Sequence, residues 1–230
     1  GKPALDRLLV ELAKIDPLRW IRVMYAYPHQ VTDSLLDVIA SEPKVCNYLD
    51  LPLQHASSTI LHSMRRGGDR GHLERLIGKI REKVPGITIR STFIVGFPGE
   101  KEEHFEELLS FLRSVKLERV GFFKYSREEG SGAEALPDQV PERMKKSRLQ
   151  MAYDVQTEIL NQVGQSMVGR NIEVLVDRIT EQGPVGRTAM DAPDIDGSVW
   201  LTGNRLSPGD MVSARVTAAQ GADLWATCTP

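Results

Sequence analysis

The segment from Ile87 to Glu100, Ile-Thr-Ile-Arg-Ser-Thr-Phe-Ile-Val-Gly-Phe-Pro-Gly-Glu, constrains the fold of this chain more than any other segment. Its apolar and β-branched residues predict a strand buried on both faces, as in a parallel sheet covered by helices. Gly96, Pro98 and Gly99 predict a sharp turn at the carboxyl end of this strand, where the backbone can approach a ligand. Because βα folds bind ligands at the carboxyl ends of their strands, the segment predicts a binding site.

The residues around this segment alternate between strand and helix patterns. Strands are predicted at residues 20–27, 48–53, 88–95 and 119–125, and helices at residues 4–15, 33–40, 58–64, 72–83 and 101–115. Such alternation predicts a parallel sheet with right-handed crossovers. Four such units amount to half a barrel, which would leave sheet edges open. We therefore expect that further units precede this sequence in the complete protein.

The pattern changes after a long predicted helix at residues 141–163. Short strands are predicted at residues 172–177, 185–188, 198–201 and 211–216, separated by Gly, Pro, Asp and Asn. No helix pattern occurs among them, and regularly spaced short strands predict a small all-β barrel or sandwich. We therefore expect an α/β domain over residues 1–164 and an all-β domain over residues 165–230.

Composition excludes several classes of function. The 230 residues carry a net charge of -2, so the chain as a whole is not a basic DNA-binding protein. It contains neither a membrane-spanning apolar run nor a signal peptide, and we expect a cytoplasmic protein. Cys46 and Cys228 are its two cysteines. Two thiols are too few for a disulfide framework or for an iron–sulfur cluster, which needs three or four thiolates.

Three motifs each have two interpretations. The turn 96–100 could be the edge of a binding site or only a tight turn, with Glu100 capping the next helix. His55 follows a strand and could line a site or be an ordinary strand-end histidine. Arg65 and Arg66 could bind an anion together with the two glycines that follow, or belong to a solvated loop. The residues alone leave these alternatives open.

Three segments together resemble the radical SAM methylthiotransferases: Tyr-Leu-Asp-Leu-Pro-Leu-Gln-His-Ala-Ser from residue 48, Met-Arg-Arg-Gly-Gly from residue 64 and Thr-Phe-Ile-Val-Gly-Phe-Pro-Gly-Glu from residue 92. The end of the chain resembles the TRAM domain of that family, a small β-barrel. The resemblance implies an α/β fold in which the last four units of a radical SAM (βα) barrel precede this TRAM barrel. Three features resemble the branch that modifies ribosomal protein uS12: Gln-His-Ala-Ser from residue 54, Arg-Arg-Gly-Gly-Asp from residue 65 and Asp-Ala-Pro-Asp-Ile-Asp-Gly from residue 191.

The resemblance implies an enzyme that methylthiolates the β-carbon of an aspartate in uS12, a protein of the small ribosomal subunit. It implies S-adenosylmethionine (SAM) and two 4Fe–4S clusters as cofactors of the full-length enzyme. The cysteines for both clusters are absent here, so we expect this polypeptide alone to be inactive. No catalytic residue and no electron donor are indicated. The resemblance implies SAM contacts at strand ends and in the segment 64–70, here called the basic loop. These contacts are Gln54, His55, Arg65, Arg66, Ser91, Ile94, Val95, Gly96 and Tyr125.

The charge of the predicted TRAM domain indicates the kind of substrate. Residues 166–230 contain five arginines, no lysine and eight acidic residues, which gives a net charge of -3. An RNA-binding domain that contacts phosphates would be basic, so this charge disfavours the alternative of a tRNA methylthiotransferase with the same fold. A second alternative is a non-catalytic module that docks on the ribosome. We predict that Asp191, Asp194 and Asp196 bind the basic surface of uS12.

Overall fold

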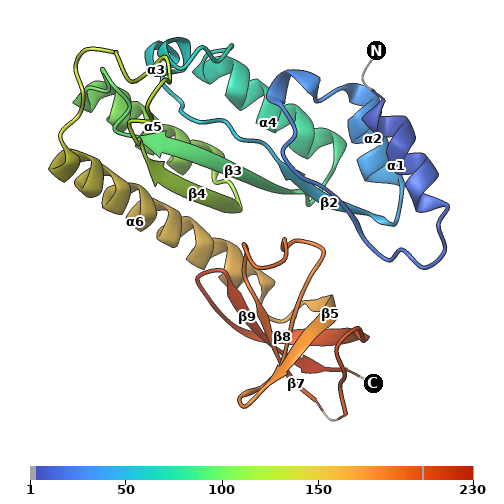
Figure 1. Cartoon of the computed structure of the whole chain (residues 1–230). Coiled ribbons are helices and arrows are strands. Elements are labelled where there is room, and N and C mark those ends of the chain that lie inside the picture. Colours follow the sequence, from blue (N-terminus) through green and yellow to red (C-terminus); the bar gives the residue numbers. More distant parts are fainter. Residues whose placement is uncertain (1–3, 204, 230) are drawn as a thin grey trace.

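The computed structural model describes residues 4–203 and 205–229, which form two units joined by a long helix (Figure 1). The first unit contains a parallel sheet with the strand order β1-β2-β3-β4. Its strands are β1 (Ile21–Val23), β2 (Val45–Asp50), β3 (Thr88–Val95) and β4 (Arg119–Lys124). Its helices are α1 (Leu5–Ala13), the 3-10 helix η1 (Pro28–Gln30), α2 (Asp33–Ser41), α3 (Ser58–Ser63), α4 (Arg70–Lys83) and α5 (Glu102–Val115).

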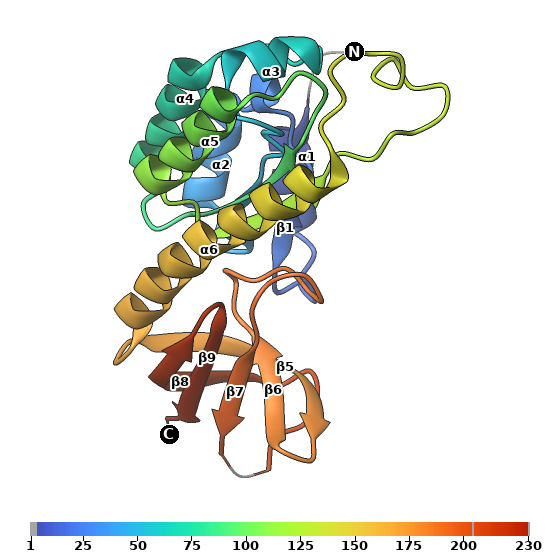
Figure 2. The same cartoon turned by 90° about the vertical axis from the view of Figure 1, so that its left-hand side faces the viewer.

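Helices α2, α4 and α5 lie along one face of the sheet (Figure 2). Strand β3 directs alternate side chains to this face, and Ile89, Phe93 and Val95 are fully buried in the main core. The ring of Phe93 lies 6.2 Å from that of Phe111 on α5 and 6.0 Å from that of Phe122 on β4. The predicted parallel sheet covered by helices is confirmed, but only the β3 face that the helices cover is fully buried, whereas Arg90, Thr92 and Ile94 on the other face are partly exposed.

Strands β1 and β2 differ from their predicted bounds. Strand β1 spans only three residues, because the backbone after it turns away and Tyr25 adopts a positive φ of 56°. Strand β2 begins at Val45, three residues earlier than predicted, and pairs with β1 and β3. Thr32 caps α2, since its hydroxyl accepts a 3.2 Å hydrogen bond from the Leu35 amide.

Helix α6 (Glu142–Met167) packs against β4 and α5 and leads into the second unit. That unit is a closed barrel with the strand order β5-β6-β7-β9-β8, as the short-strand pattern predicts. Its strands are β5 (Asn171–Thr180), β6 (Gly183–Arg187), β7 (Val199–Thr202), β8 (Met211–Gln220) and β9 (Asp223–Cys228). Strand β9 was not predicted.

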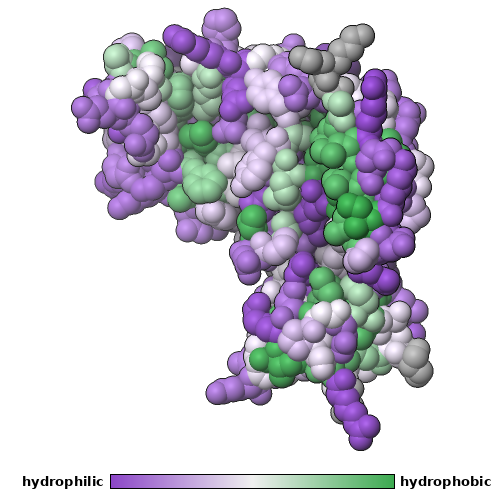
Figure 3. Space-filling view, turned by 45° about the vertical axis from the view of Figure 1, so that its right-hand side comes forward, coloured by the Kyte–Doolittle hydropathy of each residue, from purple (hydrophilic) through white to green (hydrophobic). Residues whose placement is uncertain are grey.

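Helix α1 leaves apolar side chains exposed at the surface. Leu5, Leu8 and Val10 are 38%, 53% and 39% exposed, and Ile15 just beyond the helix is 46% exposed. Figure 3 shows an apolar area on the face that bears α1. Among the described residues, no helix is both long enough and apolar enough to cross a membrane.

Candidate functional site

A cavity of about 430 Å³ lies on the face of the sheet that bears Arg90 and Thr92, opposite the face where Phe93 packs against α5. Every second residue of a strand points to the same face, so Arg90 and Thr92 of β3 reach the cavity together. Asp50 is the last residue of β2, and Pro52 and Gln54 follow at every second position and also line the cavity. The remaining lining comes from the ends of β1 and β4 and from the basic loop: Tyr25, Ala26, Tyr27, Arg66 and Phe123.

The predicted turn at residues 96–100 is joined to helix α6 by a buried ion pair. The Glu100 carboxylate accepts a 2.9 Å hydrogen bond from the Gly96 amide and a 2.8 Å bond from Arg148 of α6. Arg148 also donates to the Glu100 carbonyl at 2.9 Å. Neither carboxylate nor guanidinium is more than 3% exposed. Glu100 therefore secures the turn and its attachment to α6.

Gly96 is required by the packing of α6. Its φ is +74°, a conformation that favours glycine, and an added Cβ would lie only 2.4 Å from Lys145 Cγ. Lys145 reaches over this turn so that its ammonium donates a 3.0 Å hydrogen bond to the Tyr125 carbonyl. The close approach at Gly96 is therefore made by helix α6 itself.

Two of the nine candidate SAM contacts line the cavity, and two more, Ile94 and Tyr125, each lie two positions beyond a lining residue. Gln54 and Arg66 line it, and the Arg66 guanidinium lies 5.3 Å from the Tyr27 ring centre. Ile94 and Tyr125 belong to a small apolar cluster at the carboxyl ends of the strands. The buried Tyr125 hydroxyl has no hydrogen-bond partner in the described part of the chain. A role in SAM binding stays a prediction for these four residues.

The structure does not bring the other candidates to the cavity. His55, fully buried, accepts a hydrogen bond from the Ser57 amide, and its Nε2 lies 3.3 Å from the Glu100 carboxylate. The Ser91 hydroxyl accepts from the Leu53 amide at 3.3 Å, and Val95 is part of the main core. These residues alternate along the chain with residues that point toward the cavity, so their side chains point to the opposite face of the sheet. The two remaining candidates are Gly96, beneath Lys145, and Arg65, which is exposed.

The segment 188–197 between β6 and β7, here called the docking loop, contacts the amino-terminal part of the sheet. Asp196 of this loop accepts hydrogen bonds of 2.6 Å from Tyr48 Oη and from Arg90 Nη1. Asp191 accepts a 2.5 Å bond from Arg119 Nη2, and Arg22 donates to the Ala189 carbonyl at 2.7 Å. Burial and the adjacent Asp196 carboxylate raise the pKa of Tyr48, so the phenol stays a donor.

This placement corrects the expectation of three free carboxylates in the docking loop. The Asp191 and Asp196 side chains are 3% and 2% exposed, and each binds an arginine of the sheet. They hold the two units together and do not present charge to a partner. Asp194 is exposed, and its binding of a protein substrate stays a prediction.

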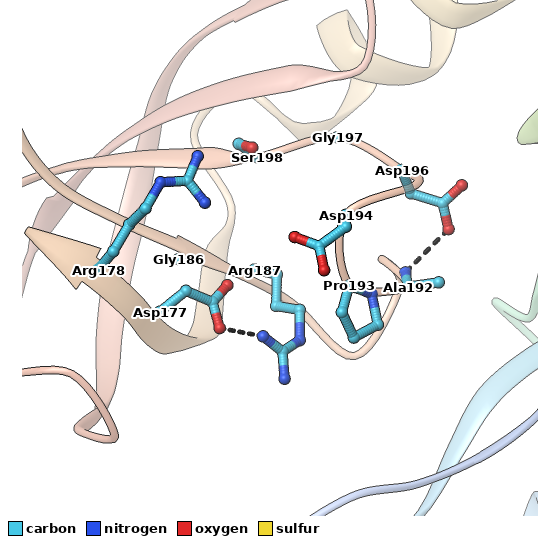
Figure 4. A pocket seen from close by; sticks show the side chains of 10 residues that line it. All are labelled: Asp177, Arg178, Gly186, Arg187, Ala192, Pro193, Asp194, Asp196, Gly197 and Ser198. Carbon is cyan, nitrogen blue, oxygen red and sulfur yellow. Dashed lines mark hydrogen bonds and ion pairs between the residues drawn. The ribbon is translucent and has the colours of Figure 1, made fainter. Parts of the chain in front are cut away.

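A second pocket, of about 480 Å³, lies on the barrel beside the docking loop (Figure 4). The Asp194 side chain points into it, opposite the ion pair between Asp177 of β5 and Arg187 of β6. Arg178 also lines this pocket. Asp194 is thus the docking-loop aspartate whose charge a partner can reach.

The charged residues that line the cavity were not predicted, although the sequence contains a sign of them. Asp50 stands in an apolar strand, and Arg90 interrupts the β-branched run of β3. A charge inside such a run requires a buried partner, because an unpaired buried charge is costly. The sequence did not indicate which distant acid would pair with each arginine.

The described residues contain no group of three or more His, Cys, Asp or Glu side chains arranged to hold a metal ion. Cys46 is buried in the first unit, and Cys228 lies on β9 of the barrel. The two thiols therefore belong to different units.

Comparisons with known proteins agree with this architecture. Residues 1–112 match the Radical SAM superfamily, and residues 168–229 match the TRAM domain. A solved structure, coproporphyrinogen III oxidase (HemN) from Escherichia coli, matches with a TM-score of 0.56 at 18% identity, covering 98% of this chain and 56% of that one. At this identity the likeness concerns the fold alone. The fold and these matches define a radical SAM unit followed by a TRAM barrel.

Sequence identity to curated relatives indicates which branch of the radical SAM proteins this chain resembles. The chain is 49% identical over 234 residues to ribosomal protein uS12 methylthiotransferase RimO of Symbiobacterium thermophilum, covering 99% of this chain and 48% of that protein. It is 47% identical to the RimO protein of Desulforudis audaxviator, covering 97% and 50% respectively. The chain belongs to the radical SAM methylthiotransferase family. It spans about half the length of the curated relatives that it matches.

The domain boundary predicted between residues 164 and 165 falls near two observed limits. Helix α6 ends at Met167, and the TRAM match begins at residue 168. Residues 1–3, 204 and 230, which the predicted domains include, lie outside the described residues.

Proposed function

We propose that this chain is part of a cytoplasmic enzyme that methylthiolates the β-carbon of an aspartate in ribosomal protein uS12. The observation that carries this proposal is the 45–49% identity to uS12 methylthiotransferases over 97–99% of the chain. The cavity at the carboxyl ends of the parallel strands supports it, because ligands of βα folds bind there. The acidic barrel supports a basic protein as the substrate.

The residues around the cavity fit SAM as a ligand. Asp50 Oδ1 and Tyr125 Oη are buried polar atoms without a hydrogen-bond partner in the described chain, and each could bond a polar group of a ligand. Gln54 would offer its amide, and Arg66 would bind the carboxylate of SAM as a fork. Ile94 would pack against the apolar side of the adenine.

When bound, SAM and an iron–sulfur cluster supply the radical that removes hydrogen from the β-carbon of the aspartate. We assign two 4Fe–4S clusters to the full-length enzyme. The residues of this chain bind and orient the reactants. The docking loop is attached to the amino-terminal side of the sheet through Asp191 and Asp196, and Asp196 holds Arg90 of the cavity wall. Asp194 remains exposed to attract the basic substrate.

Mass spectrometry of uS12 tests this proposal. In a strain that lacks the gene, the methylthio group on the uS12 aspartate should be absent, and the intact gene should restore it. A variant gene with Gln54→Ala and Arg66→Ala should restore less. If the modification persists without the gene, or if the tRNA loses a methylthio group while uS12 keeps its own, the proposed function is wrong.

A further inference from the structure

We propose that Arg90 binds the carboxylate of the target aspartate and that Asp196 of the TRAM barrel positions Arg90 for this task. This inference rests on the proposed function and names a residue that selects its substrate. It begins with the position of Arg90, a cation near the start of β3, a strand whose other face is entirely buried. Its side chain is 15% exposed and lines the cavity.

The hydrogen bonds of Arg90 leave one edge of its guanidinium available. Nη1 donates to Asp196 Oδ1 at 2.6 Å. Nε lies 3.9 Å from Asp50 Oδ1, too far for a hydrogen bond. In the described part of the chain, neither Nε nor Nη2 has a hydrogen-bond acceptor. These two donors form the fork that binds a carboxylate through two parallel hydrogen bonds.

The surroundings of this edge suit a small carboxylate on a protein chain. Gly121 of β4 pairs with Thr92 and has no side chain, so the space beside Arg90 Nη2 stays open. Tyr25 and Phe123 line the same cavity and are 76% and 61% exposed, which places apolar surface at its rim. A nucleobase substrate carries no carboxylate. An arginine fork in the cavity wall therefore favours an aspartate over an RNA base.

Asp50 would repel a bound carboxylate if it were fully ionised, but its environment opposes ionisation. Its side chain is 2% exposed, and burial raises its pKa. A protonated Asp50 could donate a hydrogen bond from its unpartnered Oδ1 to the incoming carboxylate. A second carboxylate close by would favour this protonated form further, as in paired carboxylates that share one proton.

The rival explanation is that Arg90 only ties the two units together. The same interface offers a matched control, because Arg119 and Asp191 form a second buried ion pair between β4 and the docking loop. Arg119 does not line the cavity. A purely structural role would make Arg90→Gln and Arg119→Gln behave alike, whereas substrate binding would separate them.

The test compares uS12 with a uS12 variant in which the target aspartate is asparagine. Equilibrium binding of both proteins is measured with the full-length enzyme without SAM, and methylthiolation of uS12 is measured with the reconstituted enzyme. Wild type should bind the aspartate form more tightly. Arg90→Gln should weaken binding of that form by about 10- to 100-fold, as expected for the loss of one charged hydrogen bond when glutamine keeps a single amide donor, and should abolish the preference for aspartate over asparagine.

Arg119→Gln should keep this preference even where it lowers stability. Arg90→Lys keeps the charge but loses the fork, so its preference for aspartate over asparagine should be intermediate. If Arg90→Gln fails to fold, Arg90→Lys replaces it in the test. The inference is overturned if Arg90→Gln retains the preference, or if Arg119→Gln loses it equally. If wild type binds and modifies uS12 but does not distinguish aspartate from asparagine in binding, this inference alone fails. If wild type neither binds nor modifies uS12, the proposed function fails and the inference with it.

Discussion

Asp196 accepts a 2.6 Å hydrogen bond from Arg90, although 106 positions separate the two residues along the chain. Asp191 and Arg119 repeat the arrangement at 72 positions. In both pairs the acid belongs to the barrel loop and the base to the sheet. Because buried ion pairs fix a geometry more reliably than they add stability, we interpret them as setting the orientation of the TRAM barrel. The barrel thereby determines how one wall of the cavity is built.

We expect Asp196→Asn to destabilise the protein by at least about 2 kcal/mol, because it leaves the partly buried Arg90 without the acid that it hydrogen-bonds. The Tyr48 hydroxyl would also lose a charged acceptor. Chemical denaturation measures the change. The matched control is Asp194→Asn in the same loop: Asp194 is exposed and has a φ of 61°, which asparagine tolerates well. Equal losses in the two variants would show that the ion pair contributes nothing.

The same Asp194→Asn variant is a clean test of charge in substrate binding. It removes one carboxylate from the pocket on the barrel and should preserve the loop. We expect a slower association with uS12, by about 2- to 5-fold at low salt, and a smaller difference as salt rises, because exposed charges steer the encounter. Stopped-flow or surface-based kinetics over a salt series would show this. An association rate that matches wild type at every salt concentration would remove Asp194 from the interface.

Elements with a strong local pattern could be predicted from the sequence. Strand β3 was predicted with its observed ends because β-branched residues fill it and a Gly-Phe-Pro-Gly turn closes it. Strand β1 was predicted too long, since nothing in the sequence marks the left-handed conformation of Tyr25. Strand β9 was missed because Asp223, Ala226 and Cys228 are weak strand formers, and it is stabilised by pairing with β7 and β8.

The candidate site was harder to predict than the fold. The turn was correctly placed, but the sequence could not show that α6 covers Gly96, because Lys145 lies 49 positions away in an unremarkable helix. In the sequence, Asp191 and Asp196 belong to an acidic segment with Pro and Gly, which is typical of an exposed loop. Their burial depends on arginines in another unit, and such long-range pairing leaves no periodic signal in a single sequence.

We expect Gly96→Ala to reduce stability through a backbone effect and a steric effect. The positive φ alone should cost about 1 kcal/mol. The new methyl group would also lie within 2.4 Å of Lys145 Cγ and push α6 away. Gly99→Ala is the matched control, since its φ is +81° and no atom lies within 4 Å of the added Cβ. Thermal unfolding should show the larger loss at Gly96, and Lys145→Ala in the same chain should recover part of it. Equal losses at both glycines would argue against the Lys145 contact.

Asp50 should make stability depend on pH in a direction opposite to that of an ordinary ion-paired aspartate. Burial raises its pKa above the usual 3.8, and this outweighs the opposing effects of the Tyr25 amide and Arg90. The folded protein therefore binds the Asp50 proton more tightly than the unfolded chain does. The resulting stabilisation is complete below about pH 3.8 and is lost as pH rises through the folded pKa. Asp50→Asn, which can still accept from the Tyr25 amide, should remove this dependence. Urea unfolding between pH 4 and pH 8 should show that the free energy of unfolding of Asp50→Asn rises relative to that of wild type as pH increases. The control Asp16→Asn, at an exposed position, should show no such trend. Parallel profiles for Asp50→Asn and wild type would refute the assignment.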